Sequence, residues 1–258
     1  MHGSAPRVGA RGAVRLVGLG AATLAWLSAA TLHESLVPER QRGPIFQRYM
    51  KRWGHSLVYR TGGRVYLTPD SVVPEHVGPR LVVANHRSPF DIGILLSLFG
   101  GHALSRADLA GWPVLGVAAQ RAGTIFVDRT KADSGASAIR TIRKKLTEGA
   151  SILVFPEGST FAGDEVQPFK PGAFTAVRNL RAQIVPVGLA YDPGAEWVNE
   201  SFVAHVLRVA ERPRTRCVVA IGAPVPAAGR SQELADTLQA RVQELVQRAR
   251  ADWTRRFA

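Results

Sequence analysis

The chain alternates between short apolar runs and stretches in which apolar residues recur at helical spacing. Each run is bounded by turn residues and predicts a strand, and the runs span residues 64–68, 81–85, 124–128, 151–155, 183–189 and 216–221. Helical stretches lie between most of them, such as the one in which Ile139, Ile142 and Leu146 share an apolar face. This alternation predicts an α/β domain built on a largely buried sheet.

Two residues inside these runs carry structural information. Pro186 stands in the middle of the run 183–189, and because proline has no amide hydrogen we expect it at a sheet edge or a bulge. Cys217 is the only cysteine of the chain, so neither an intramolecular disulfide nor a thiolate metal cluster can form. We expect Cys217 to be a buried, inert packing residue.

The N-terminal part of the chain has a different pattern. Residues 16–32 form an apolar segment of 17 residues without a charge, which is at the short limit for crossing a bilayer. Residues 44–55 follow as a basic amphipathic stretch. We interpret residues 1–60 as a membrane anchor with a basic interfacial helix, and residues 61–258 as the domain that carries the chemistry. The anchor could span the membrane or lie in one leaflet.

Two alternatives to this interpretation stay open. Arg7, Arg11 and Arg15 before an apolar stretch that ends in small residues are also typical of a cleaved signal peptide. We favour an uncleaved anchor, because a secreted protein usually holds more than one cysteine. The basic stretch 44–55 could also be a helix that packs its aromatic stripe on the domain.

The net charge indicates an anionic partner. The chain has 33 Lys and Arg against 20 Asp and Glu, a net charge of +13, and its first 64 residues contribute +8 of this charge. Such a balance is typical of proteins that bind nucleic acid, an anionic membrane surface or a phosphorylated substrate. Because most of the excess flanks the apolar segment, we favour the membrane surface and expect no nucleic-acid partner.

A possible catalytic pair follows the run 81–85. His86 stands where the apolar run ends, and Pro89 suits the first turn of a following helix. Asp91 would then lie about one turn beyond His86 and could bind one ring nitrogen, which leaves the other free to accept a proton. This is the base half of a catalytic triad without its serine, so a hydroxyl of the substrate could be the nucleophile. A His-x4-Asp pair alone could equally cap a helix.

Further motifs follow this pair in order. They are Gly123-Thr-Ile-Phe-Val-Asp-Arg129, Phe155-Pro-Glu-Gly158 and Val185-Pro186-Val187, with Phe169-Lys170-Pro-Gly172 between the last two. Together with Asn85-His86-Arg-Ser-Pro-Phe-Asp91, the set resembles the glycerolipid acyltransferase family, in particular its 1-acylglycerol-3-phosphate (lysophosphatidic acid) acyltransferases. The resemblance covers about residues 64–225 and implies a mixed sheet flanked by helices.

The resemblance also implies a reaction. His86 would remove the proton from the hydroxyl of the acceptor, and Asp91 would hold the imidazole. The oxygen would then attack the thioester of acyl-CoA or acyl-carrier protein, without a covalent acyl-enzyme. The most favoured acceptor is 1-acylglycerol-3-phosphate, which would give phosphatidic acid.

The acceptor site is implied by the same motifs. Arg129 would bind the phosphate of the acceptor, since a guanidinium matches phosphate geometry. Lys170 would be a second cation, although it could also be a solvated loop residue. Glu157 and Gly158 are implied as acceptor-binding positions, with Glu157 accepting a hydrogen bond from a hydroxyl, ordering the loop or serving as a structural carboxylate.

The chain departs from the common family pattern at one place. After Glu157-Gly158 many members have threonine and then arginine, whereas this chain has Ser159, Thr160 and Phe161. Because a cation is missing there, another lysolipid such as lyso-ornithine lipid is an alternative acceptor.

The remaining sequence indicates no resident cofactor. It holds neither a zinc-type Cys/His cluster nor a nucleotide-binding glycine fingerprint. We expect an enzyme without a cofactor whose partners are membrane lipids and the acyl donor, located at the inner or plasma membrane with its catalytic domain facing the cytoplasm. A non-catalytic basic membrane-binding protein would explain the charge but not the ordered motifs.

Overall fold

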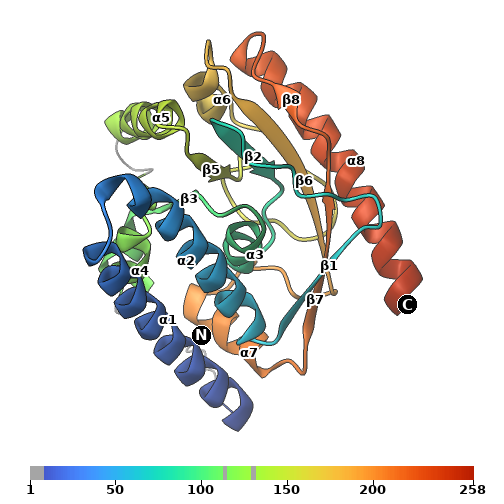
Figure 1. Ribbon diagram of the computed structural model, residues 1–258. Helices are drawn as coiled ribbons and strands as arrows, with labels where there is room; N and C mark the ends of the chain where they lie inside the picture. The colour runs from blue at the N-terminus through green and yellow to red at the C-terminus, as the bar shows by residue number, and fades with distance from the viewer. Residues whose placement is uncertain (1–8, 113–114, 129–131) are drawn as a thin grey trace.

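The structure of the protein is a computed structural model that describes residues 9–112, 115–128 and 132–258. Two helices come first, α1 (Ala10–Ser35) and α2 (Glu39–Tyr59), and they pack side by side. The rest of the described chain folds around one sheet with helices on both faces (Figure 1). The N-terminal helix pair therefore precedes the sheet in sequence and packs on the domain mainly through α2 and α3 (Phe90–Phe99).

The sheet is mixed, as the sequence predicts. Within the described residues its strands follow the order β1-β7-β6-β2-β5-β3-β4, with β8 paired to β6, and every pairing is parallel except those of β6 with β7 and with β8. The strands are β1 (Gly63–Leu67), β2 (Arg80–Ala84), β3 (His102–Arg106), β4 (Ile125–Val127), β5 (Ser151–Val154), β6 (Gln183–Tyr191), β7 (Thr215–Ile221) and β8 (Val225–Pro226). All six predicted strands are present, whereas β3 and β8 were not predicted because neither contains an apolar run.

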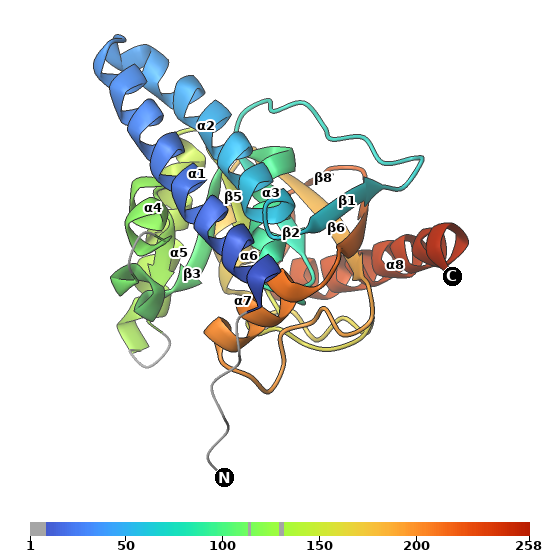
Figure 2. The same ribbon diagram turned by 90° about the horizontal axis from the view of Figure 1, so that it is seen from below.

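Alternate residues of the strands pack against different helices, because successive side chains of a strand point to opposite faces of the sheet. Val82 and Ala84 of β2 belong to the core formed with α2 and α3, whereas Leu81 and Val83 belong to the core formed with α5, α6 and α8. Figure 2 shows α8 on the opposite side of the sheet from α1 and α2. The helices of the domain are α3 (Phe90–Phe99), η1 (Ala107–Gly111), α4 (Leu115–Arg121), α5 (Ala132–Thr147), α6 (Gly172–Val177), α7 (Phe202–Glu211) and α8 (Ser231–Phe257).

Pro186 marks a bulge and not a sheet edge: between the pairs Val187–Ile221 and Ile184–Val225, two residues of β6 face three residues of the partner segment. Strand β6 lies in the interior of the sheet, between β2 and β7. On the side away from β2 it pairs with β8 at residues 183–184 and with β7 from residue 187 onward. The Pro186 carbonyl oxygen accepts a hydrogen bond from the Gly222 amide on that side, at 2.9 Å, so the Pro186 nitrogen faces the gap between β8 and β7. Strand β2 pairs with β6 here through Val83, but on the other side residues 185–186 lie between the pairings with β8 and β7, so no ladder bond requires an amide hydrogen at Pro186.

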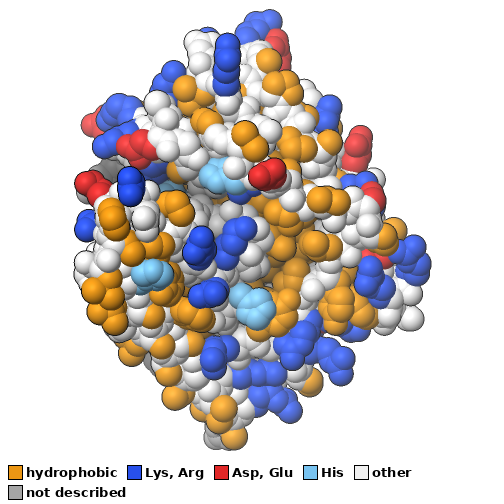
Figure 3. Space-filling view, in the orientation of Figure 1, with side chains coloured by type: hydrophobic (Ala, Val, Ile, Leu, Met, Phe, Trp, Pro, Cys, Tyr) orange, Lys and Arg blue, Asp and Glu red, His pale blue; other side chains and the backbone are white. Residues whose placement is uncertain are grey.

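The apolar N-terminal segment forms α1, which is long and apolar enough to cross a membrane. Val14, Val17, Leu24 and Leu32 are each more than half exposed. The N-terminal end of the helix is fixed to the domain, because the Arg15 guanidinium donates hydrogen bonds to the carbonyl oxygens of Ala210 and Arg212, at 2.9 and 2.6 Å. In Figure 3 hydrophobic side chains gather over α1 and basic side chains over the neighbouring α2.

Candidate active site

The predicted site residues lie at one edge of the sheet. Strands β2, β3, β4 and β5 are parallel, so their carboxyl ends meet at the same edge, where α/β proteins place their ligands. His86 follows the end of β2, and Phe155 follows the end of β5. Both line a cavity of about 870 Å³, called here the His86 cavity, whose walls are completed by β3, α5, α6 and residues 197–202.

His86 and Asp91 form the expected contact. The Nδ1 atom of His86 lies 2.7 Å from Oδ2 of Asp91, and the His86 ring stacks on Phe155 with 4.2 Å between ring centroids. The His86 side chain is 17% exposed, whereas that of Asp91 is fully buried. Among the described residues no group hydrogen-bonds Nε2 of His86. The ring is therefore fixed on one side, and its second nitrogen can accept a proton in the cavity.

Asp91 is held by several donors besides His86. Its Oδ2 atom also accepts hydrogen bonds from the backbone amides of Arg87 and Ser88, at 2.6 and 2.9 Å. Its Oδ1 atom accepts one from the hydroxyl of Tyr191, at 2.6 Å. Burial, followed by the charge of Asp91, raises the pKa of Tyr191 well above its usual value, so the hydroxyl keeps its proton and donates throughout the physiological range. The carboxylate thus has one orientation.

Glu157 faces the protein and not the cavity. Its side chain is fully buried and accepts hydrogen bonds from the amide of His86 at 2.5 Å, from the guanidinium of Arg87 at 3.1 Å and from the amide of Gln167 at 2.9 Å. Its oxygens are therefore committed to protein donors. This geometry favours the loop-ordering role considered for Glu157 over contact with an acceptor.

The remaining acceptor-site predictions fall on different parts of the structure. Lys170 is exposed and lines the His86 cavity next to Gly158. A Cβ atom at Gly158 would lie 2.8 Å from the Lys170 Nζ, and the φ angle of 78° at Gly158 favours glycine. Arg129 lies outside the described residues.

The residues after Glu157-Gly158 form part of the cavity wall. Ser159, Thr160 and Phe161 all line the His86 cavity, and the Thr160 hydroxyl donates a hydrogen bond to the Trp197 carbonyl oxygen at 2.6 Å. The position at which many relatives have arginine therefore joins two segments of the wall. It brings a hydroxyl to the cavity in place of a positive charge.

Sequence reasoning missed the groups that hold the pair in place. Tyr191 lies 100 residues beyond Asp91 along the chain, and Arg87 was not singled out although it stands beside His86. Tyr191 is the last residue of an apolar strand, and its sequence context predicts an ordinary core residue. Arg87 carried one signal, a charge within an otherwise buried junction, since a fully buried arginine requires a carboxylate partner.

Comparison with known proteins gives consistent results. Residues 64–190 match a family model described as acyltransferase. The chain is 30% identical over 225 residues to the lyso-ornithine lipid O-acyltransferase of Pseudomonas aeruginosa, with 83% of this chain and 82% of that protein covered. It is 32% identical over 118 residues to a 1-acyl-sn-glycerol-3-phosphate acyltransferase of Neisseria gonorrhoeae, where the match spans 46% of each protein.

A solved structure shares the fold. The crystal structure of the 1-acyl-sn-glycerophosphate (LPA) acyltransferase of Thermotoga maritima superposes with a TM-score of 0.64. The match covers 95% of this chain and 99% of that one, at 19% sequence identity. It extends over the N-terminal helices as well as the sheet, so the helix pair belongs to the shared architecture.

The buried pair of Glu157 and Arg87 makes a test of the loop-ordering role. We expect Glu157→Ala to lower the free energy of unfolding by about 3–5 kcal/mol, because it leaves the Arg87 charge buried without its partner. Asp108→Ala is the matched control, since the Arg106–Asp108 pair is more than half exposed and should contribute no more than about 1 kcal/mol. Denaturant unfolding measures both. Equal losses in the two variants would contradict a structural role for Glu157.

Proposed function

The chain belongs to the acyltransferase family, and we propose that it transfers an acyl group from a thioester donor to the free hydroxyl of a lysolipid. The proposal rests on the position of His86, which contacts a buried carboxylate on one side and a cavity on the other. One ring nitrogen is 2.7 Å from the buried Asp91 carboxylate, and the ring lines a cavity of about 870 Å³. A base in this setting can activate a hydroxyl that enters the cavity.

The proposed reaction needs no nucleophile from the protein. The acceptor hydroxyl gives its proton to Nε2 of His86 as its oxygen forms a bond to the thioester carbonyl carbon. The C–S bond then breaks, and the departing thiolate takes the proton back from the imidazolium, so that an ester and a thiol are formed. Asp91 stabilises the transient positive charge and keeps Nδ1 protonated, because a carboxylate can only accept a hydrogen bond from it. Acyl-CoA and acyl-carrier protein both supply such a thioester.

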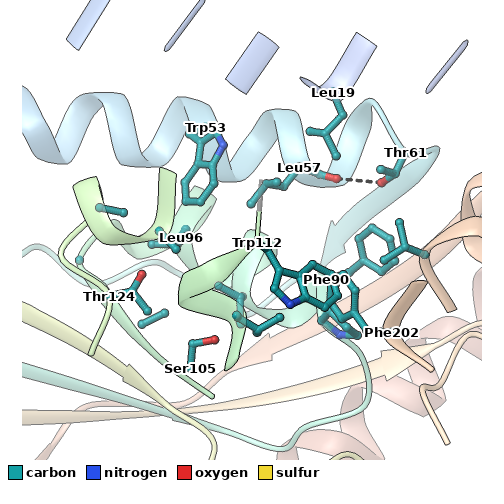
Figure 4. A pocket seen from close by; sticks show the side chains of 18 residues that line it. Leu19, Trp53, Leu57, Thr61, Phe90, Leu96, Ser105, Trp112, Thr124 and Phe202 are labelled. Atoms are coloured by element: carbon teal, nitrogen blue, oxygen red, sulfur yellow. Dashed lines mark hydrogen bonds between the residues drawn. The ribbon is translucent and has the colours of Figure 1, made fainter. Parts of the chain in front are cut away.

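An apolar cavity beside His86 supports a lipid substrate. This apolar cavity has a volume of about 140 Å³ and shares Pro89, Ile92 and Phe202 with the His86 cavity. In Figure 4 its labelled side chains include Trp53 and Leu57 on the α2 side. We propose that an acyl chain enters it, since apolar walls bind alkyl chains through removal of apolar surface from water.

The first proposed acceptor is lyso-ornithine lipid. The relative with this printed activity aligns over most of both chains, as does a second one from Brucella abortus, which is 26% identical over 227 residues. The wall residue Thr160 supports the same choice, because it replaces a cation that a phosphate-binding site would use.

The second proposed acceptor is 1-acylglycerol-3-phosphate, the one that the sequence motifs favour most. Lys170 supports it, because its exposed ammonium group lines the His86 cavity and could pair with a phosphate. The role of Arg129 as a phosphate ligand remains part of this proposal.

We also propose that α1 and α2 attach the protein to one leaflet of a membrane, with the catalytic domain on the cytoplasmic side, where acyl thioesters are made. The exposed apolar residues of α1 and the exposed Arg48, Lys51 and Arg52 of α2 support this arrangement. The Arg15 contacts with α7 also support it. They hold α1 along the domain, which is unlike a helix that leaves the domain to cross a bilayer.

The function is tested with purified, detergent-solubilised protein. Acyl-CoA and acyl-carrier protein thioesters are offered with lyso-ornithine lipid, 1-acylglycerol-3-phosphate and other lysophospholipids, and the acylated products are measured. We expect product from wild type, and a loss of about 100- to 10,000-fold in His86→Ala, because that variant lacks the general base. His102→Ala is the matched control, since His102 bonds the Ala122 carbonyl oxygen and does not line the His86 cavity.

Each acceptor predicts its own result in this assay. Turnover of lyso-ornithine lipid alone supports the first acceptor, and turnover of 1-acylglycerol-3-phosphate alone replaces it with the second. Wild-type turnover in a folded His86→Ala variant would contradict the proposed mechanism. Absence of product with every donor and acceptor would contradict the proposed function.

The membrane proposal is tested by washing isolated membranes. We expect the protein to resist a high-salt wash and to be released by detergent, because apolar contacts are not screened by salt. The double variant Val17→Glu, Leu24→Glu should move largely to the soluble fraction. Val72→Glu changes an equally exposed residue away from α1 and should remain membrane-bound. Complete release of wild type by salt would overturn the role of α1.

A further inference from the structure

A second group of polar residues contacts the loop that carries His86 and Asp91. It has no role in the reaction described above. The Oγ atom of Ser88 is 2.9 Å from Nε2 of His205, and Nδ1 of His205 is 2.9 Å from Oε1 of Glu200. Ser88 and His205 are fully buried. His205 and Glu200 lie beyond residue 190, where the match to the family model ends.

The chemistry of the three groups determines which nitrogen of His205 is protonated and in which direction each hydrogen bond runs. The Glu200 carboxylate, which also accepts from the guanidinium of Arg208 at 2.5 Å, can only accept, so Nδ1 of His205 carries the proton. Nε2 of His205 then accepts a hydrogen bond from the Ser88 hydroxyl. The pKa of His205 is lowered, mainly by burial, although its contacts with Glu200 act to raise it. The neutral imidazole satisfies all three groups at once.

The order serine, histidine, carboxylate is also that of a nucleophilic triad, but the surroundings exclude this use. Ser88 has no exposed surface, and it lines neither the His86 cavity nor the apolar cavity. No thioester carbonyl can reach its hydroxyl. The group must act on the protein itself.

The three residues connect the cavity wall to the base. The Ser88 amide donates to Oδ2 of Asp91 at 2.9 Å, the same oxygen that binds His86. At the other end, Glu200 lines the His86 cavity. The wall is joined to the loop a second time, because the Trp197 amide donates to the Arg87 carbonyl oxygen at 2.8 Å. Ser88 thus links the two sets of contacts: its hydroxyl binds His205, which binds Glu200 in the wall, and its backbone amide binds Asp91, which binds the imidazole of His86.

We propose that His205 is a positioning residue: it holds Ser88 so that the loop 86–91 presents Asp91 to His86, and it fastens this loop to the Glu200 wall of the His86 cavity. The inference rests on the proposed function, since the group to be positioned is the general base. It predicts an effect on the rate of the bound complex and not on substrate affinity, because neither Ser88 nor His205 touches the cavity.

The test compares Ser88→Ala, His205→Phe and the double variant in the full-length, detergent-solubilised protein. We expect kcat to fall about tenfold in each single variant, which is the effect of losing one buried hydrogen bond from the positioned pair, with KM for donor and acceptor unchanged. The double variant should be no slower than the slower single variant, because both act through one chain of contacts. Ser97→Ala on α3, the helix that follows the loop, should keep wild-type kcat, because its hydroxyl donates its single hydrogen to the Ile94 carbonyl oxygen.

A spectroscopic measurement separates positioning from a general loss of structure. In protein labelled with ¹⁵N-histidine, the Nδ1–H signal of His86 should be present in wild type and Ser97→Ala, and broadened or shifted in Ser88→Ala and His205→Phe. Thermal unfolding identifies any variant that does not fold. If His205→Phe does not fold, the test rests on Ser88→Ala, which is the smaller change.

Three outcomes would overturn the proposal. They are an unchanged kcat in folded Ser88→Ala and His205→Phe, a double variant in which the two losses multiply, and an unchanged His86 signal in both variants. If wild type itself transfers no acyl group, the proposed function fails, and the His86 signal alone still decides whether His205 positions the loop.

Discussion

The buried carboxylate of Asp91 is the group on which the arrangement of the site depends. It accepts hydrogen bonds from the imidazole of His86, from the amides of Arg87 and Ser88 and from the hydroxyl of Tyr191. Burial of a carboxylate costs free energy unless its oxygens accept hydrogen bonds. Asp91 can therefore be buried only when these donors are in place. The orientation of His86 follows from this set, since its ring has no other hydrogen-bond partner among the described residues.

The sheet explains how these donors come together. Strands β2 and β6 are parallel neighbours, so the loop after β2 and the end of β6 lie side by side although they are far apart in sequence. Asn85 joins the two strands directly, because its side-chain amide exchanges hydrogen bonds of 2.9 and 2.8 Å with the backbone of Leu189. Two residues further along β6, Tyr191 reaches Asp91. The same edge of the sheet opens to the His86 cavity. It therefore both holds the Asp91 carboxylate and exposes the His86 ring.

Local pattern predicted much of this arrangement. The run 81–85 followed by His86, Pro89 and Asp91 indicates a strand-to-helix junction with two facing side chains, because all the information lies within eleven residues. The mixed α/β sheet follows from the alternation of elements and from the family resemblance. What remained hidden depends on tertiary neighbours.

The parts that were missed share this physical reason. Tyr191 and His205 have ordinary local surroundings, and only the adjacency of β6 and α7 to the loop after β2 makes them partners of the site. Glu157 sits in a family motif, but the sequence cannot tell that its carboxylate turns inward to Arg87 and the His86 amide. Whether Pro186 marks an edge or a bulge could not be decided from the sequence, because the break between the pairings of β6 with β8 and with β7 is a property of the assembled sheet.

In the proposed mechanism the acyl group passes directly from donor to acceptor, with His86 as the base. Intact-protein mass spectrometry after incubation with acyl donor alone, stopped by acid, tests it most directly. Direct transfer predicts an unchanged protein mass at every time point, followed by rapid product formation once the acceptor is added. A mass increase by one acyl group, formed and consumed at rates that match turnover and mapped to a side chain such as Ser88, would contradict it.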